Sequence, residues 1–289
     1  MHSMAATPSR SEVAQVGFIG LGDMGGAIAS RIIGAGFPTR LWARRPEALE
    51  AFTGPEVRTA ATPAELAAGV DLVGICVWDD HAVGDVLYGN DGVLAGAREG
   101  TVIAIHSTVL PATVREAAAA AADRGVMLVD APVSGGREVA LSGNLVVAAG
   151  GDAAAVQRCR PVFAAFGAHV FHLGPVGAGQ LAKLINNSLL AANLAVADDA
   201  IALAQSLRLE PTALAEVIRH GSGRSAGFDV ALLSRESADA RNRAAELLRK
   251  DVCCLTVNAA PKECADAALF TLAARQGVER LSFPPGGEK

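Results

Sequence analysis

Hydrophobic and polar residues follow two different patterns along the chain, and the change falls near Gly177. From Val13 to about Leu173, short apolar runs rich in Val and Ile alternate with segments of helical character. This alternation predicts a mostly parallel β-sheet with helices on both faces. The expected strands are residues 16–19, 39–43, 70–77, 101–105, 126–129, 145–149 and 169–172, and the clearest helices are 23–35, 46–52 and 111–124.

After Gly177 no strand pattern is found, and helices are expected at residues 177–207, 211–220, 238–258 and 261–276. The sequence therefore predicts an α/β Rossmann-type doubly wound sheet, residues 13–176, followed by an all-helical domain, residues 177–289. The long helix 177–207 is expected to join the two domains. Residues 1–12 lack a hydrophobic stretch, which predicts a flexible N-terminal tail rather than a signal peptide.

The composition indicates a folded protein with a large core, and it excludes several classes of binding partner. Hydrophobic residues make up 51% and charged residues 19% of the 289 residues, so there is little case for disorder. A net charge of −5 offers no basic surface for nucleic acid. Polar residues interrupt the apolar part of helix 177–207, so no membrane span is expected. Five cysteines without CxxC spacing indicate reduced thiols in a cytoplasmic protein and no metal cluster.

A glycine-rich turn directly after the first strand is the first candidate for chemistry. Its sequence is a G-x-G-x-x-G that opens a helix. Glycines at these positions permit a tight turn and let a pyrophosphate approach the positive end of the helix. We interpret the motif as a dinucleotide site; the alternative is a glycine turn that only packs. The residues expected to bind the cofactor here are Gly20, Leu21, Gly22, Asp23, Met24 and Gly25.

The residues at the end of the second strand are expected to determine the specificity for NAD or NADP. NAD-binding proteins carry an acidic residue about 20 positions after the glycines, where it holds the ribose 2′-hydroxyl. Here the strand ends in Arg44 and Arg45, with no carboxylate where one is needed. Two guanidinium groups suit the 2′-phosphate of NADP, so NADP is favoured and NAD remains possible. The alternative is that one or both arginines point into water.

Two further stretches offer groups for a small substrate. Lys183 and Asn187 lie four positions apart near the start of the long helix, so an amine and an amide share one side of it. Ser134, Gly135 and Gly136 follow a strand and form a compact donor set that suits a carboxylate. Each stretch has a structural alternative, a solvated helix surface in the first case and a plain turn in the second.

Four more residues are candidates for the site. Thr108 follows the fourth strand and Val77 ends the third, at the sheet edge where doubly wound folds bind their ligands, and Val77 is expected to border the cofactor. Lys250 and Asp251 are neighbours inside the helix expected at 238–258. Taken alone, such a pair is interpreted as a solvated ion pair.

Together these motifs resemble those of the β-hydroxyacid dehydrogenase family, which includes 3-hydroxyisobutyrate dehydrogenases, tartronate semialdehyde reductases and glyoxylate/succinic semialdehyde reductases. The resemblance runs from Val16 to about Ala259. It rests on the stretches 17–25, 130–136 and 174–187 and on the Lys250-Asp251 pair. The first motif is shared with many Rossmann proteins, whereas the second and third, in this order and separation, are specific.

The resemblance implies a role for each residue of the site. Lys183 is implied to be the catalytic residue, and Thr108 and Lys250 to lie near the cofactor; Asn187, Ser134, Gly135 and Gly136 are implied to bind the substrate. The chemistry is consistent with this, because oxidising an alcohol needs a base for its proton while hydride leaves for nicotinamide. A lysine in a dry cleft can act in both directions. No metal is required.

Some positions depart from the family's pattern. Arg243 stands seven residues before Lys250, where the family commonly has Phe. We hypothesise that Arg243 lines the substrate pocket and favours a second anionic group; the alternative is a side chain in solvent. Arg31 and His106 stand where the family often has Asn and Asp, and local packing is a sufficient reason for each.

The leading hypothesis is an NAD(P)-dependent oxidoreductase that interconverts a small 3-hydroxy acid and its semialdehyde or oxo form. A small carboxylate-bearing substrate is the expected partner, and the apolar, Ala-rich helical domain suggests a homodimer or homotetramer. One alternative is an imine reductase-like enzyme, although that group usually lacks a lysine at the position of Lys183. The other alternative is a non-catalytic dinucleotide-binding sensor or scaffold.

Overall fold

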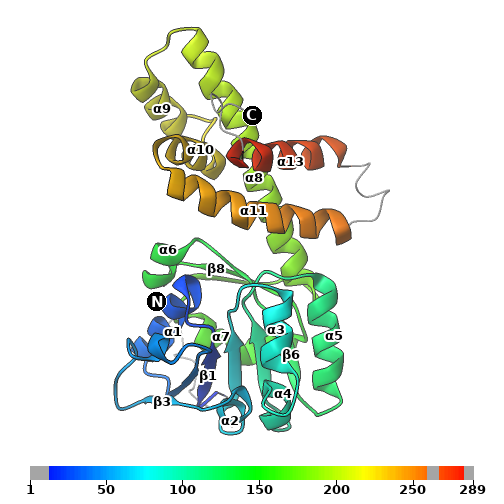
Figure 1. Ribbon diagram of the computed structural model, residues 1–289. Coiled ribbons are helices and arrows are strands. Elements are labelled where there is room, and N and C mark those ends of the chain that lie inside the picture. Colours follow the sequence, from blue (N-terminus) through cyan, green and yellow to red (C-terminus); the bar gives the residue numbers. More distant parts are fainter. Residues whose placement is uncertain (1–12, 259–266, 283–289) are drawn as a thin grey trace, which may run out of the picture. The chain divides into compact units, whose positions relative to one another are not determined.

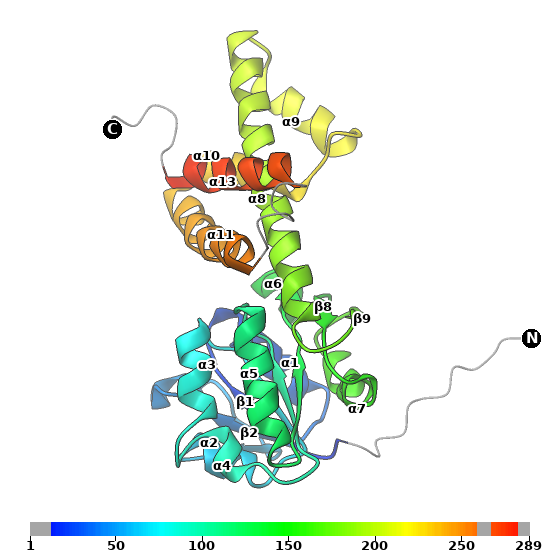
Figure 2. The same ribbon diagram turned by 90° about the vertical axis from the view of Figure 1, so that its right-hand side faces the viewer.

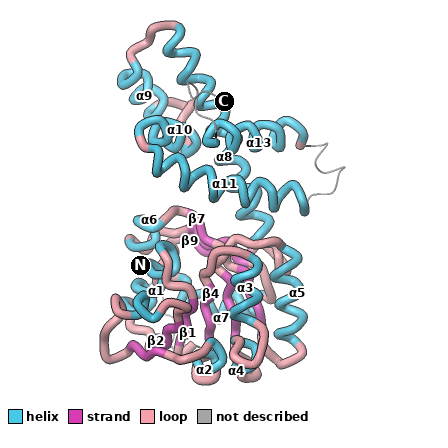
Figure 3. Tube along the Cα trace, in the orientation of Figure 1, coloured by secondary structure: helices cyan, strands magenta, loops and turns pink. Residues whose placement is uncertain are grey.

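The computed structural model describes residues 13–258 and 267–282, so the predicted tail at 1–12 and residues 261–266 of the last expected helix lie outside the described residues. The chain divides into two compact units, residues 1–183 and 184–289. All the strands lie in the first unit, and the second is helical in its described part (Figure 3). The predicted fold class, a Rossmann-type sheet followed by a long helix and a helical domain, is confirmed.

The first unit is organised around a six-stranded parallel sheet with the strand order β3-β2-β1-β4-β5-β6 (Figure 1). Buried Val, Ile and Leu side chains make the central strands apolar on both faces, as a parallel sheet covered by helices requires. The strands are β1 (Val16–Ile19), β2 (Thr39–Trp42), β3 (Val57–Thr59), β4 (Leu72–Ile75), β5 (Val102–Ile105) and β6 (Met127–Asp130).

Helices cover both faces of this sheet, and each face has its own buried apolar cluster. Figure 2 shows the two layers from the side. One face is covered by α1 (Asp23–Gly34), α6 (Arg137–Leu141) and α7 (Ala153–Phe163). The other is covered by α2 (Pro63–Ala67), α3 (Asp80–Leu87), α4 (Val93–Gly96) and α5 (Pro111–Ala122).

A second, three-stranded sheet extends the first unit. Its order is β7 (Val133–Ser134), β8 (Val146–Ala149) and β9 (His169–His172), with β7 antiparallel and β9 parallel to β8. The strands expected at 145–149 and 169–172 therefore exist, but in this sheet. Several short elements were not predicted, namely β3, β7, α2, α3, α4, α6 and α7, and residues 46–49 form a single 3₁₀ turn in place of the helix 46–52.

The second unit contains most of α8 (Ala178–Ser206), together with α9 (Pro211–His220), α10 (Ala226–Glu236), α11 (Ala238–Asn258) and α13 (Ala268–Ser282). Helix α10 was not predicted, and α13 runs to residue 282 rather than 276. Small residues let these helices approach α8 closely. A side chain at Gly227 of α10 would collide with the backbone of Leu194, and one at Gly277 of α13 with the carbonyl of Ala191.

Helix α8 is long and apolar enough to cross a bilayer by length and composition alone, with a mean hydropathy of 1.2 over its most apolar window. Of that window, 56% is buried inside the protein, as in the core helix of a soluble domain. The helix also carries Asp198, which is buried and bound by two arginines. These features are those of a core helix.

His106 and Arg31 are both explained by packing within the first unit. His106 is buried, its Nδ1–H donates to the carbonyl of Ala131 at 2.8 Å, and its ring stacks on Phe18 at a centroid distance of 6.0 Å. Arg31 Nε donates to the carbonyl of Ala165 at 3.0 Å. Burial lowers the pKa of His106 to about 4, so the ring is neutral at pH 7.

His106 predicts a loss of stability in mild acid. The unfolded chain takes up this proton near pH 6.5 and the folded chain only near pH 4, so folding is favoured less as the pH falls through that window. The expected loss is about 3 kcal/mol between pH 6.5 and pH 4. Urea unfolding of the wild type and of His106→Phe at several pH values measures it.

In this comparison, Phe keeps the aromatic packing and removes the proton. His106→Phe should be less stable at pH 7, because the Ala131 carbonyl loses its donor, yet its stability should fall less steeply below pH 6.5. Other groups titrate equally in both proteins, so the difference between the two slopes isolates His106. Equal slopes would contradict the assignment.

Candidate active site

The glycine-rich turn between β1 and α1 has the geometry of a dinucleotide-binding turn. Gly20 has a φ of +92°, and a side chain at Gly25 would collide with the carbonyl of Gly20. These two glycines are therefore required by the fold itself. Gly22 is different, because its φ is −72° and a Cβ there would meet nothing within 4 Å. A glycine at this position is explained by a ligand that approaches the backbone closely.

The start of α1 faces a pocket of about 590 Å³ within the first unit. Gly22 is the N-cap of α1 and no side chain caps the helix, so its first N–H groups are available to an anion. All six residues of the turn line the pocket, as do Arg44, Arg45 and Val77, and so do Trp42, Cys76 and Trp78, which the sequence did not single out. The pocket fits a nicotinamide dinucleotide, with its pyrophosphate at the start of α1.

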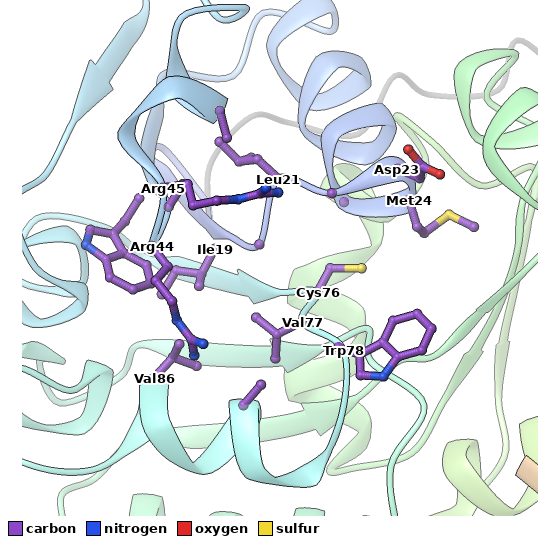
Figure 4. Close-up of a pocket in the computed structure, with 17 residues that line it drawn as sticks. Ile19, Leu21, Asp23, Met24, Arg44, Arg45, Cys76, Val77, Trp78 and Val86 are labelled. Atoms are coloured by element: carbon purple, nitrogen blue, oxygen red, sulfur yellow. The ribbon is translucent and has the colours of Figure 1, made fainter. Parts of the chain in front are cut away.

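Charge is distributed unevenly along this pocket. Figure 4 shows Arg44 and Arg45 at one end, and Met24, Cys76 and Trp78 at the other. Arg44 Nη2 donates to Asp85 Oδ2 at 3.1 Å, and both side chains are largely exposed. Both arginines line the pocket, and the end that they form suits a phosphate group.

A buried carboxylate joins two of the sequence motifs at the carboxyl end of the sheet. Asp130, the last residue of β6, is fully buried. Its Oδ1 accepts the backbone N–H of Gly177 at 2.7 Å, and its Oδ2 accepts that of Gln180 at 2.8 Å. Burial raises the pKa of the Asp130 carboxyl, while these backbone hydrogen bonds oppose the shift. Asp130 thus caps α8 from a distant strand.

The Gln180 side chain fixes the loop after β5 against the start of α8. Its Nε2 donates to the carbonyl of Ser107 at 2.8 Å and its Oε1 accepts the N–H of Val109 at 3.1 Å. Thr108 lies between these two anchored residues, and Lys183 lies one helical turn beyond Gln180. The structure therefore brings Thr108 and the start of α8 together, as expected for residues of one site.

The turn that is expected to bind a carboxylate, residues 134–136, begins four residues after Asp130. Ser134 ends β7, and Gly135 and Gly136 follow with φ values of +140° and +82°. A side chain at Gly135 would crowd Val139, whereas one at Gly136 would meet nothing within 4 Å. The turn is held by the pairing of β7 with β8, so the Ser134 hydroxyl stands on a fixed backbone.

In the second unit, Asn187 is held by the Lys-Asp pair. Asn187 is buried, and its Nδ2 donates to Asp251 Oδ2 at 2.5 Å. Asp251 is fully buried, and Lys250 Nζ lies 3.7 Å from Asp251 Oδ1 with 23% of its side chain exposed. The interpretation of Lys250 and Asp251 as a solvated ion pair is therefore wrong. Asp251 instead orients the amide of Asn187, a partner 64 residues away that no local pattern indicates.

Arg243 is the last of the expected site residues to be placed, and the structure also bears on metal binding. Arg243 is exposed on α11 and lies on the side of the helix opposite to its buried residues, among them Ala245 and Val252. Within the described residues, no three His, Cys, Asp or Glu side chains gather in a way that could hold a metal ion.

A doubly wound sheet with a glycine turn and a dinucleotide-sized pocket, followed by a helical unit, is typical of nicotinamide-dependent dehydrogenases. Residues 15–174 match the model of the NAD-binding domain of 6-phosphogluconate dehydrogenase. Residues 177–280 match the model described as the NAD-binding of NADP-dependent 3-hydroxyisobutyrate dehydrogenase.

Individual proteins agree with these matches. The chain is 37% identical over 216 residues to the NAD-dependent L-serine dehydrogenase of Pseudomonas aeruginosa, covering 75% of this chain and 72% of the relative. The structure resembles that of Mycobacterium tuberculosis 3-hydroxyisobutyrate dehydrogenase with L-serine, at 28% identity and a TM-score of 0.76, covering 93% of this chain and 94% of the other. It also resembles Psf3 in complex with NADP+ and 2-OPP, at 29% identity and a TM-score of 0.78, covering 92% and 94%. The chain belongs to the β-hydroxyacid dehydrogenase family.

The two kinds of glycine in the turn predict opposite effects of alanine. Gly22→Ala should change the free energy of unfolding by less than about 0.5 kcal/mol, because its Cβ enters open space. It should weaken cofactor binding about tenfold or more, because the same Cβ stands where the pyrophosphate approaches. Gly25→Ala should cost about 2 kcal/mol or more of stability.

Urea unfolding measures the stabilities, and tryptophan fluorescence measures cofactor binding. Both tryptophans of the chain, Trp42 and Trp78, line the pocket and report on its occupant. Unchanged cofactor affinity in Gly22→Ala would show that the pyrophosphate does not lie at this turn.

Proposed function

We propose that this protein is an NADP-preferring oxidoreductase that interconverts a small 3-hydroxy acid and its semialdehyde or oxo form, with Lys183 as general acid and base. The observation that carries the proposal is the anchoring of Lys183. Gln180, one turn before it, binds the loop around Thr108, and Asp130 fixes the first turn of the same helix at the carboxyl end of the sheet. Ligands of doubly wound folds bind at this end.

In the proposed reaction Lys183 Nζ takes the hydroxyl proton of the alcohol and returns it to the carbonyl oxygen in the reverse direction. The bound nicotinamide supplies the hydride acceptor or donor. Asn187 orients the substrate; its Nδ2 donates to Asp251 Oδ2 and its Oδ1 accepts Asn186 Nδ2 at 3.0 Å. Both ends of the amide are therefore held in place, and the oxygen keeps a second lone pair for the substrate. The Ser134 hydroxyl and the Gly135 and Gly136 amides hold the substrate carboxylate, and a rigid turn supports this role.

Other members of the site are assigned by the same proposal. Thr108 and Lys250 lie near the cofactor, and Arg243 contacts a second anionic group of the substrate. The exposed position of Arg243 on α11 leaves its guanidinium accessible to a ligand. Lys183 favours hydroxyacid chemistry over imine reduction, and the presence of a complete polar set at α8 favours an enzyme over a cofactor sensor.

We infer the preference for NADP from this chain's own residues, because its relatives differ in the cofactor that they use or bind. One relative is named as NAD-dependent and one similar structure contains NADP+. Two arginines at one end of the pocket, with no carboxylate on β2 beside them, support recognition of the 2′-phosphate. A reduction screen of small semialdehydes and 3-oxo acids with NADPH and NADH tests both the substrate class and the cofactor.

We also propose a cytoplasmic homo-oligomer. Cys76, Cys159, Cys253 and Cys254 form no disulfide with one another, which favours a reducing compartment. Large apolar side chains are exposed on the second unit, among them Val196, Leu203 and Leu269 at 65%, 59% and 81%. Such surfaces favour association of the helical units into a dimer or tetramer.

Lys183→Ala should lower turnover about 1,000-fold while the affinity for NADPH changes less than about twofold. Lys183→Arg should not restore the rate, because a guanidinium keeps its proton. Steady-state kinetics and fluorescence titration measure the two quantities. An unchanged rate would remove the proposed mechanism, and a wild type without turnover on any substrate of the screen would favour the sensor.

Arg45→Gln should reduce the NADPH-over-NADH ratio of kcat/KM about tenfold, because one charge-assisted contact to the 2′-phosphate is lost. Arg44→Gln should have a somewhat smaller effect, since the 2′-phosphate must first displace Asp85 from that guanidinium, at a cost of about 0–1 kcal/mol. Arg275→Gln, on the exposed face of α13, is the matched control for loss of positive charge. A wild type that prefers NADH would overturn the NADP assignment.

A further inference from the structure

The helical unit contains a second polar pocket that the proposed reaction does not use. It has a volume of about 260 Å³ and lies among α8, α10, α11 and α13. Asp198 contributes from α8, Ser234 and Arg235 from α10, Arg241 from α11 and Arg280 from α13. Apolar side chains complete the wall. Three guanidinium groups therefore converge on one small pocket.

The carboxylate of Asp198 fixes two of these guanidinium groups. Arg235 donates to Asp198 Oδ1 from Nε at 2.9 Å and from Nη2 at 2.6 Å, and Arg280 Nη1 donates to Oδ2 at 3.1 Å. Arg280 Nη2 also lies 2.5 Å from Asp199 Oδ1. Each guanidinium carries five N–H donors, so both arginines keep donors beyond these contacts. They are held in place and only partly neutralised.

Arg241 brings the positive charge that these carboxylates do not balance. Its one side-chain hydrogen bond within the described chain, from Nη1 to the carbonyl of Ser234, is long at 3.5 Å. Three arginines thus face Asp198 in the pocket and Asp199 at its edge. The pocket therefore carries a net positive charge.

Ser234 adds an unsatisfied donor. It is only 6% exposed, and within the described residues its Oγ has no hydrogen-bond partner. A buried hydroxyl without a partner costs stability, and such groups are rare unless a ligand or water completes them. A helical serine can bond to the carbonyl four residues earlier, yet this one does not and instead lines the pocket.

We propose that this pocket is a binding site for a small phosphate-class dianion, either inorganic phosphate or a phosphomonoester. The guanidinium groups of Arg235, Arg241 and Arg280 supply charge-assisted hydrogen bonds, and the Ser234 hydroxyl supplies a further donor. The volume admits a small anion and excludes a nucleotide. Next to it, a hollow of about 350 Å³ shares Arg241 and continues to Arg249, so the organic part of a monoester has space.

The site is independent of the proposed dehydrogenase reaction, since every residue named in it lies outside the catalytic and cofactor set. Calorimetric titration of the full-length protein with inorganic phosphate and with glycerol phosphate tests it. NADP+ is kept saturating, so that phosphate does not report on the dinucleotide pocket, and chloride keeps the ionic strength constant. At pH 7.5 both ligands are mainly dianions.

The wild type should show saturable binding, and Arg241→Gln should weaken it about tenfold or more. Arg241 takes no part in the Asp198 contacts, so this variant should keep the wild-type melting temperature and NADP+ affinity. Ser234→Ala should weaken binding severalfold without lowering the melting temperature of the ligand-free protein, because the hydroxyl it removes has no partner. Arg275→Gln, with the same change of charge on exposed α13 surface, should bind like the wild type.

Tighter binding of glycerol phosphate would support a monoester as the ligand, and equal or weaker binding would support the free anion. Absence of saturable binding to the wild type would overturn the proposal. Binding that is unchanged in Arg241→Gln would also overturn it, as would an equal loss in Arg275→Gln, which would indicate a general charge effect.

Discussion

The buried carboxylate of Asp130 is the interaction on which the arrangement of the first unit depends. A buried carboxyl group is costly unless hydrogen bonds replace its hydration, and here the backbone N–H groups of Gly177 and Gln180, at the start of α8, do so. The same contact satisfies N–H groups that a helix start leaves without partners. One carboxyl group at the end of β6 thus determines where α8 begins.

The consequences follow along α8. Because its first turn is fixed to β6, Gln180 can reach the loop after β5, and its amide holds the backbone on both sides of Thr108. Lys183 comes one turn later on a helix that cannot slide. The close approach also explains Gly179, where a side chain would collide with the carbonyl of Ala148. Asn187 receives a second anchor from Asp251, so rigid elements rather than loops carry the polar groups of the helix.

Periodicity and motif context were sufficient to predict the central strands, the glycine turn and the longest helices, because those features are encoded within a few neighbouring residues. Helix α9 was predicted at its observed bounds, since Pro211 begins it and apolar spacing continues through it. Helix α10 was missed because Gly227 argues against a helix, although that glycine permits the close crossing with α8. The Lys250-Asp251 pair was misinterpreted because Asn187, the partner of Asp251, is 64 residues away in sequence. Contacts between distant segments are absent from local patterns.

The arginines of the dinucleotide pocket and those around Asp198 differ in burial. This difference determines how easily each guanidinium can exchange its carboxylate for another anion. The Arg44–Asp85 pair is exposed, and such pairs contribute about 0–1 kcal/mol, so a 2′-phosphate can replace the carboxylate at little cost. Asp198 is buried, with 8% of its side chain exposed, and removing it would leave two guanidinium groups without their partner. An exposed pair leaves an arginine free to exchange partners. A buried carboxylate holds its arginines still, so their remaining donors are oriented before any anion arrives, and less entropy is lost on binding.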